Sequence, residues 1–178
     1  LTDEDIVAAL TNGDALVREH AVRLSEPLLA GSSALQTVIP TMAGDPSPRV
    51  RYQLAYTLGE HPTAQNPPDA FLSIAQSDGD DTWMRLALLS SLTEGADEVL
   101  AAFLKDDSSS TEDRGVRDFL GQLAELVGSS GRASDVRTVV DAVESASGNQ
   151  KRIVQSVVRQ LLNGLNRASI SEDTRSVL

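Results

Sequence analysis

The sequence predicts an all-α fold: a right-handed α-solenoid of about five helical hairpins that forms one domain over residues 1–178. Two observations predict it. Hydrophobic residues make up 40% of the chain but aromatic residues only 3%, and the apolar side chains are mostly Ala, Leu and Val, of which Ala and Leu are strong helix formers. In addition, a sequence pattern recurs with a period of about 33 residues, which is typical of a two-helix repeat unit.

The repeat is marked by an apolar residue followed by arginine, with an acidic or polar run before the pair and an apolar helix after it. Four segments share this pattern: DALVREHAVRL at 14–24, DPSPRVRYQLAYTLGE at 45–60, DDTWMRLALLSSL at 80–92 and EDRGVRDFLGQLAEL at 112–126. Their arginines, Arg18, Arg51, Arg85 and Arg117, are nearly evenly spaced, and Arg152 is a weaker fifth match at a similar interval. Apolar residues then follow each arginine at helical spacing, as in Leu54, Ala55 and Leu58.

Each unit contains a second helical stretch, predicted at 33–43, 68–76, 96–104 and 132–146. The repeats therefore cover about 14–43, 45–76, 80–104, 112–147 and 149–178, and residues 3–11 resemble the second helix of a truncated earlier repeat. Pro40 is expected to kink its helix. Gly59, Gly95 and Gly128 are expected to end helices in the left-handed conformation. Because the pattern begins and ends inside a repeat, we expect the chain to be a segment of a longer protein.

The order of Asp turn, Val-Arg, apolar pairs and Leu-Gly resembles the HEAT and PBS-lyase-like repeat families, most clearly in DPSPRVRYQLAYTLGE. Residues 14–104 resemble more narrowly the HEAT segment of large planctomycete-type multidomain proteins, through RLSEPLL at 23–29, PRVRYQLAYTLGE at 48–60 and DDTWMRLALLSSL at 80–92. Those proteins often join a dehydrogenase-like β-propeller to helical repeats and a c-type cytochrome domain. The resemblance implies an exported or periplasmic parent, an oxidoreductase whose haem chemistry lies outside this segment, since the chain has no Cys-x-x-Cys-His.

Arginines and aspartates recur together in the repeats: Arg18 with Asp14, Arg51 with Asp45, Arg85 with Asp81 and Arg117 with Asp113. One hypothesis is a charged ladder that recognises an extended acidic partner. The favoured interpretation is a structural ladder, in which each aspartate caps a helix and holds an arginine from its own or the next hairpin.

Little in the sequence favours catalysis or a cofactor. The chain has no cysteine and only two histidines, which are not at metal-ligand spacing. DGDD at 78–81 fails as a calcium loop because Trp83 and Leu89 stand where Gly and Glu are needed. The formal net charge of −11 argues against nucleic acid as a partner, and no run of about 20 apolar residues predicts a membrane span. We therefore expect no catalytic, metal or cofactor site in this segment.

The expected function is to present a surface. Aromatic residues are enriched at binding hot spots, so Tyr52, Tyr56 and Trp83 are candidate contact residues, with partial packing against the neighbouring hairpin as the alternative. The second helices are expected to line the concave face and to expose Gln36, Thr37, Ser73 and Gln76. The prediction is a non-catalytic scaffold that binds a protein or spaces neighbouring domains of the same chain. The alternative is an enzyme-associated repeat domain of the lyase- or hydroxylase-related kind.

Overall fold

The computed structural model is all-helical over the residues that the structure describes, 1–60, 68–105, 113–146 and 150–168. This part of the chain contains no strand, which confirms the all-α prediction. Its elements are α1 (Asp3–Leu10), α2 (Ala15–Leu29), α3 (Ser33–Val38), η1 (Ile39–Gly44), α4 (Pro48–Glu60), α5 (Pro68–Asp78), α6 (Thr82–Ser91), α7 (Ala96–Lys105), α8 (Arg114–Ser130), α9 (Ala133–Ser145) and α10 (Lys151–Arg167).

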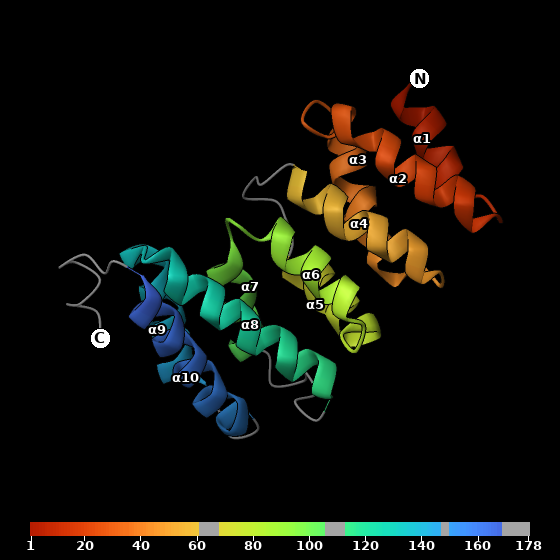
Figure 1. Cartoon of the computed structure of the whole chain (residues 1–178). Coiled ribbons are helices and arrows are strands. Elements are labelled where there is room, and N and C mark those ends of the chain that lie inside the picture. Colours follow the sequence, from red (N-terminus) through yellow and green to blue (C-terminus); the bar gives the residue numbers. More distant parts are fainter. Residues whose placement is uncertain (61–67, 106–112, 147–149, 169–178) are drawn as a thin grey trace.

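The helices form two layers in which sequence order is kept (Figure 1). Helices α2, α4, α6, α8 and α10 contact one another in succession, and we call them the even layer. Helices α1, α3, α5, α7 and α9, with η1 between α3 and α5, do the same and are called the odd layer. Contacts between the layers also join neighbours in sequence, as between α1 and α2 or α7 and α8. Each helix is therefore stabilised mainly by elements one or two places away in chain order.

The core lies between the layers and follows the predicted helical face. The residues three and seven positions after Arg18, Arg51, Arg85 and Arg117 are all buried: Ala21, Ser25, Leu54, Leu58, Leu88, Leu92, Leu120 and Ala124. Positions three and four apart share one face of a helix, so α2, α4, α6 and α8 present the same stripe to the odd layer. Ser25, which fits this stripe poorly by its polarity, donates its hydroxyl to the carbonyl oxygen of Val22 at 2.6 Å.

Proline and glycine have partly the predicted roles. At Pro40 the α-helix gives way to the 3-10 helix η1, because proline has no N–H to donate within an α-helix. Gly95 has a φ of 81° and is left-handed as predicted. The same prediction is wrong for Gly59 and Gly128, which lie inside α4 and α8 without positive φ. The left-handed residue that ends α8 is Gly131, with a φ of 65°.

Gly59 and Gly128 instead allow even-layer helices to approach closely. A Cβ atom at Gly59 would lie 2.5 Å from the Cβ atom of Ser91 in α6. One at Gly128 would lie 2.2 Å from the carbonyl oxygen of Leu161 in α10. Neither distance is compatible with a side chain, so glycine at these positions sets the spacing between neighbouring helices.

A second stripe on each even-layer helix faces the preceding even-layer helix. Thr57 of α4 is fully buried there and donates to Oε1 of Glu26 in α2 at 2.8 Å. The equivalent Ser91 in α6 and Leu123 in α8 are also buried. In α2 the equivalent residue, Leu24, is 50% exposed, because no even-layer helix covers α2 on that side.

Substituting Gly128 tests the close approach of α8 and α10. We expect Gly128→Ala to lower the free energy of unfolding by about 1–3 kcal/mol, because the added methyl group meets backbone that cannot move aside easily. Gly13→Ala is the matched control, since nothing lies within 4 Å of a Cβ at that position, and it should change stability by less than about 0.5 kcal/mol. Urea denaturation followed by circular dichroism measures both, and equal stabilities would contradict the packing.

Candidate interaction site

Ion pairs between arginine and aspartate link successive even-layer helices. Arg18 of α2 binds Asp45, just before α4, through Nε–Oδ2 and Nη2–Oδ1 contacts of 2.7 and 2.9 Å. Its Nη1 also donates to the carbonyl oxygens of Asn12 and Gly13. The Arg18 and Asp45 side chains are only 12% and 3% exposed. The guanidinium of Arg18 therefore links α2 to the turn that precedes it and to the turn that precedes α4.

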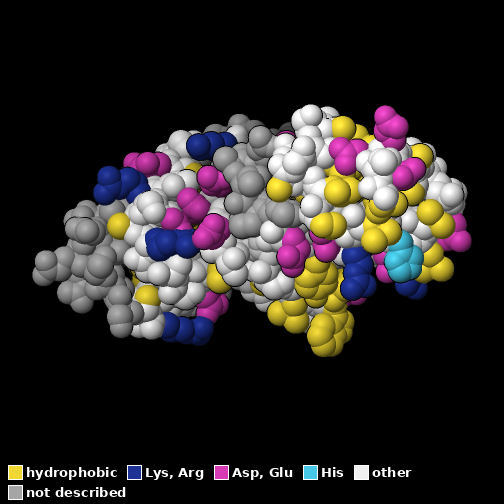
Figure 2. Space-filling view, turned by 90° about the horizontal axis from the view of Figure 1, so that it is seen from above, with side chains coloured by type: hydrophobic (Ala, Val, Ile, Leu, Met, Phe, Trp, Pro, Cys, Tyr) yellow, Lys and Arg dark blue, Asp and Glu magenta, His cyan; other side chains and the backbone are white. Residues whose placement is uncertain are grey.

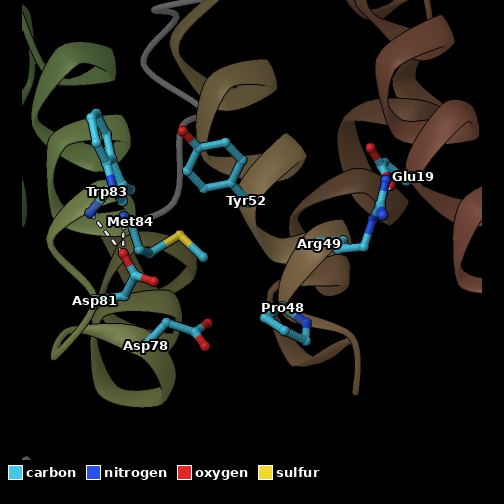
Figure 3. Close-up of a pocket in the computed structure, with 8 residues that line it drawn as sticks. All are labelled: Glu19, Pro48, Arg49, Tyr52, Asp78, Asp81, Trp83 and Met84. Carbon is cyan, nitrogen blue, oxygen red and sulfur yellow. Dashed lines mark hydrogen bonds and ion pairs between the residues drawn. The ribbon is translucent and has the colours of Figure 1, made fainter.

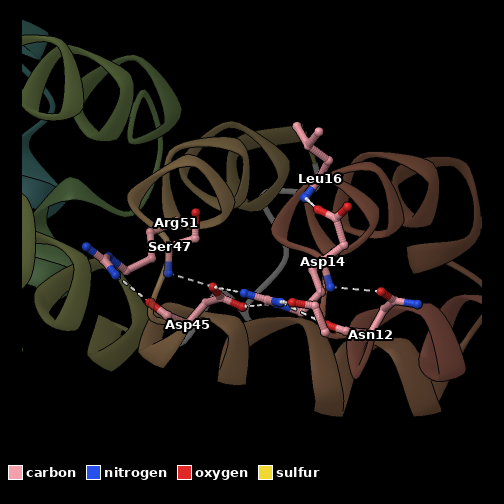
Figure 4. A network of polar contacts seen from close by, with 8 residues as sticks. Asn12, Asp14, Leu16, Asp45, Ser47 and Arg51 are labelled. Atoms are coloured by element: carbon pink, nitrogen blue, oxygen red, sulfur yellow. Dashed lines mark hydrogen bonds and ion pairs between the residues drawn. The ribbon is translucent and has the colours of Figure 1, made fainter.

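The next repeat contains the same arrangement one unit further along. Arg51 of α4 binds Asp78 through Nε–Oδ2 and Nη2–Oδ1 contacts of 2.6 and 2.7 Å, and its Nη1 donates to the carbonyl oxygen of Asp45. Figure 4 shows Asp45 between the two arginine units, where it also accepts the backbone N–H of Ser47 at 2.8 Å. In both units the aspartate follows its arginine at the same sequence separation of 27.

Among the described residues, the third unit shows only part of this pattern. Arg85 donates to the carbonyl oxygen of Gly79 and to Oγ1 of Thr82, while its buried Nε has no hydrogen-bond partner in the described part of the chain. The residue that follows Arg85 at the same separation, Glu112, lies outside the described residues. Arg117 occupies the equivalent position in α8.

The aspartates differ in role from the predicted ladder. Asp14, Asp81 and Asp113 cap α2, α6 and α8 by accepting backbone N–H groups. The ion partner of Arg18 is Asp45 rather than Asp14, and that of Arg51 is Asp78 rather than Asp45. Asp78 was missed as a ladder residue, although the constant separation between each arginine and its partner was present in the sequence. Nearness in sequence to the arginine was the misleading signal.

These contacts shift the protonation equilibria of the paired groups. The bidentate contact with Arg18 lowers the pKa of the Asp45 carboxyl below its ordinary value of 3.8, against the opposing effect of burial. The hydrogen bonds to Asp45 and Asp78 likewise raise the pKa values of Arg18 and Arg51. Asp45, Arg18 and Arg51 are therefore charged at neutral pH.

The three candidate aromatic residues lie together on the even layer. Tyr52 and Tyr56 of α4 meet edge to face, with ring centroids 5.2 Å apart and hydroxyl oxygens 3.1 Å apart. This hydroxyl contact raises the pKa of Tyr52. Tyr52 packs against the core and Tyr56 is 41% exposed, whereas Trp83 of α6 is 70% exposed. The packing alternative thus applies to Tyr52 and is wrong for Trp83.

A hollow of about 360 Å³ lies between Tyr52 of α4 and Trp83 of α6 (Figure 3). Pro48, Arg49 and Tyr52 line it on the α4 side, and Asp81, Trp83 and Met84 line it on the α6 side. Glu19 and Asp78 complete the lining. We call this hollow the aromatic groove.

Large exposed hydrophobic side chains of the described residues concentrate on α2, α4 and α6. Figure 2 shows hydrophobic side chains gathered on one half of the molecule, with a group projecting from its edge. Among the described residues the large exposed ones are Leu1, Leu16, Val17, Leu24, Tyr56, Trp83, Leu86 and Leu162. All except Leu1 and Leu162 belong to α2, α4 or α6, so the apolar surface is largely a property of the N-terminal half of the even layer.

The four polar residues expected on a concave face lie on the second helices of their units, as predicted, but not at the aromatic groove. Gln36 and Thr37 belong to α3, and Ser73 and Gln76 to α5, all in the odd layer. Thr37 and Gln76 are exposed and Ser73 is half-buried. Gln36 is also half-buried, and its Nε2 donates to the carbonyl oxygen of Leu29 at 2.8 Å, so this side chain supports the turn before α3. None of the four lines the aromatic groove.

Asp45 gives the stability of the protein a pH dependence with a definite sign. Its pKa is lower in the folded chain than in the unfolded chain, so its contribution is fully present above about pH 4 and is lost as pH falls through the folded pKa. We expect Asp45→Asn to be less stable than wild type at pH 7 and to lose less stability on acidification. Urea unfolding from pH 7 to pH 2.5 measures this difference, and parallel profiles would contradict it.

Removing a ladder aspartate should cost more than removing a capping aspartate. Asp78→Ala leaves the largely buried guanidinium of Arg51 without its carboxylate, for which we expect a loss of about 3 kcal/mol. Asp14→Ala removes one N-cap hydrogen bond and should cost about 1 kcal/mol. Chemical denaturation of the two variants measures both losses, and equal losses would show that the two roles are not separate.

Other kinds of site were sought over the described residues. That part of the chain holds no group of three or more His, Cys, Asp or Glu side chains arranged to bind a metal. It also contains no helix long and apolar enough to cross a membrane.

Comparisons with known proteins do not assign the chain to a family. No family model matches the sequence, no curated protein is significantly similar to it, and no solved structure is a significant match.

Proposed function

We propose that this chain is a non-catalytic α-solenoid of HEAT-like hairpins that presents the aromatic groove to a protein partner. The sequential contacts within the even and odd layers support the solenoid, because each hairpin packs only against its neighbours in such folds. The Arg-Asp ion pairs between successive units support it as well. The haem-containing parent and its export stay predictions from the sequence resemblance.

The exposure of Trp83 carries the proposal of a binding role. An indole that is 70% exposed leaves apolar area in water, and such area is costly for a side chain with no partner. Trp83 also lines the aromatic groove across from Tyr52, which meets Tyr56 edge to face. Most large exposed apolar residues of the described chain belong to α2, α4 and α6, and hydrophobic side chains gather on one half of the molecule (Figure 2). Patches of this kind mark interaction surfaces, whereas a domain that only spaces its neighbours needs none.

Removing the indole should abolish partner binding without unfolding the chain. We expect Trp83→Ala to lose the specific partner in quantitative affinity capture from the source cells, because hot-spot aromatic side chains contribute about 2 kcal/mol or more to binding. The free energy of unfolding should change by less than about 0.5 kcal/mol, because the side chain is exposed.

Leu16→Ala provides the matched control. Leu16 occupies the same repeat position in α2, two residues before the arginine, and is 46% exposed. Its substitution should retain the partner. Recovery of the same proteins by wild type, Trp83→Ala and Leu16→Ala would contradict the binding role and favour a spacer.

A further inference from the structure

Only one of the two carboxylate oxygens of Asp81 accepts hydrogen bonds from the described residues. Its Oδ1 accepts the backbone N–H groups of Trp83 and Met84 at 2.7 and 3.2 Å, which caps α6. Within the described residues its Oδ2 accepts no hydrogen bond. Figure 3 shows this second oxygen directed toward the space between α6 and α4, below Trp83. The aromatic groove therefore holds one anionic oxygen that is available to a ligand.

The remaining charges in the groove largely cancel. Arg51 pairs with Asp78 at 2.6 Å, and Arg49 pairs with Glu19 at 2.9 Å. The N-terminus of α6 adds a partial positive charge of about half a unit, which is smaller than the full negative charge of Asp81. Among the residues that line the groove, Asp81 therefore carries the single charge without an ion-pair partner; Arg85, which donates to Gly79 and Thr82, is not part of the lining.

The walls of the groove suit the other parts of a basic side chain. Trp83 and Tyr52 line the hollow from opposite helices, Met84 lies between them, and Pro48 adds apolar surface below Tyr52 on the α4 side (Figure 3). Lysine and arginine side chains have an apolar stem and a charged head, and the head is attracted to the faces of indole and phenol rings. The stem would contact Met84 and Pro48 while the head lies near Asp81.

The wider charge distribution favours the same class of partner. Residues 1–105 contain fifteen acidic and six basic side chains, and the whole chain carries a net charge of −11. A field of this sign attracts basic segments and repels acidic ones before contact.

We propose that the aromatic groove binds a lysine or arginine side chain from an extended segment of a partner protein, with Asp81 as its counter-ion. This inference rests on the proposed binding function and names the chemistry of the partner. An acidic segment is the principal rival, since it would be attracted by Arg49 and by the N-terminus of α6.

Peptide selection with matched variants tests the proposal. The whole chain is immobilised, and a library of random dodecapeptides is selected against it, with Trp83→Ala as counter-selection. We expect the recovered peptides to be enriched in a lysine or arginine at one position. Replacing that residue by norleucine in the tightest peptide should weaken binding about tenfold, as measured by fluorescence anisotropy.

Asp81→Asn removes the negative charge of Asp81 while keeping its role as the cap of α6. Asparagine caps helices about as well as aspartate, so α6 should persist, and unchanged thermal unfolding checks this. We expect Asp81→Asn to weaken the basic peptide about tenfold, since charge-assisted hydrogen bonds are the strong ones, and to have no effect on its norleucine variant. Asp14→Asn, the same repeat position in α2, is the control and should bind the peptide as wild type does.

The outcomes separate this inference from the proposed function. Peptides that depend on Trp83 but carry acidic or only apolar side chains, or that are insensitive to Asp81→Asn, would overturn the basic-ligand inference and leave the binding role intact. A selection that yields no peptide dependent on Trp83 would overturn both.

Discussion

The bidentate ion pair between an arginine of one even-layer helix and an aspartate of the next turn is the contact on which the other features depend. Arg18 with Asp45 and Arg51 with Asp78 join successive repeat units at one constant sequence separation. Both guanidinium groups also donate to backbone carbonyl oxygens of the turn before their own helix. Hydrophobic contact between layers is not directional, whereas a planar guanidinium accepts few geometries. The ion pairs therefore fix how successive hairpins are aligned.

The candidate site exists because different aspartates bind an arginine and cap the helix at the turn before α6. Before α4, Asp45 binds Arg18 and also accepts the N–H of Ser47, so its oxygens are fully used. Before α6, two residues share these tasks, because Asp78 holds Arg51 and Asp81 caps the helix. Having two carboxylates at this turn leaves Oδ2 of Asp81 without a hydrogen bond among the described residues. That oxygen lies beside the most exposed aromatic side chain of the described chain, and the groove combines charge with apolar surface for this reason.

Much of the fold could be predicted because a helix can be recognised from the spacing of apolar residues within a single segment. The spacing of Leu54 and Leu58, or of Leu88 and Leu92, marks the buried face at intervals that only a helix satisfies. The candidate site was predictable in part. Tyr52 and Tyr56 are one helical turn apart and were expected on one face, but nothing in the sequence placed Trp83 across a hollow from Tyr52. The polar residues of α3 and α5 were assigned to a binding surface from the pattern, but Gln36 and Ser73 are half-buried and none of the four lines the aromatic groove.

The sequence by itself determined the helical class, the repeat length and the positions of the buried stripes, since these follow from periodicity and propensity within single segments. Tertiary structure decided which aspartate each arginine binds, since the choice depends on how neighbouring hairpins are aligned and not on distance along the chain. It also decided the meaning of Gly59 and Gly128, which look like helix ends in the sequence but serve as points where two helices nearly touch. The exposure of Trp83 was likewise decided by the tertiary structure. An indole at that position would be buried or free according to where the adjacent helix lies, and only the packing of α4 against α6 settles it.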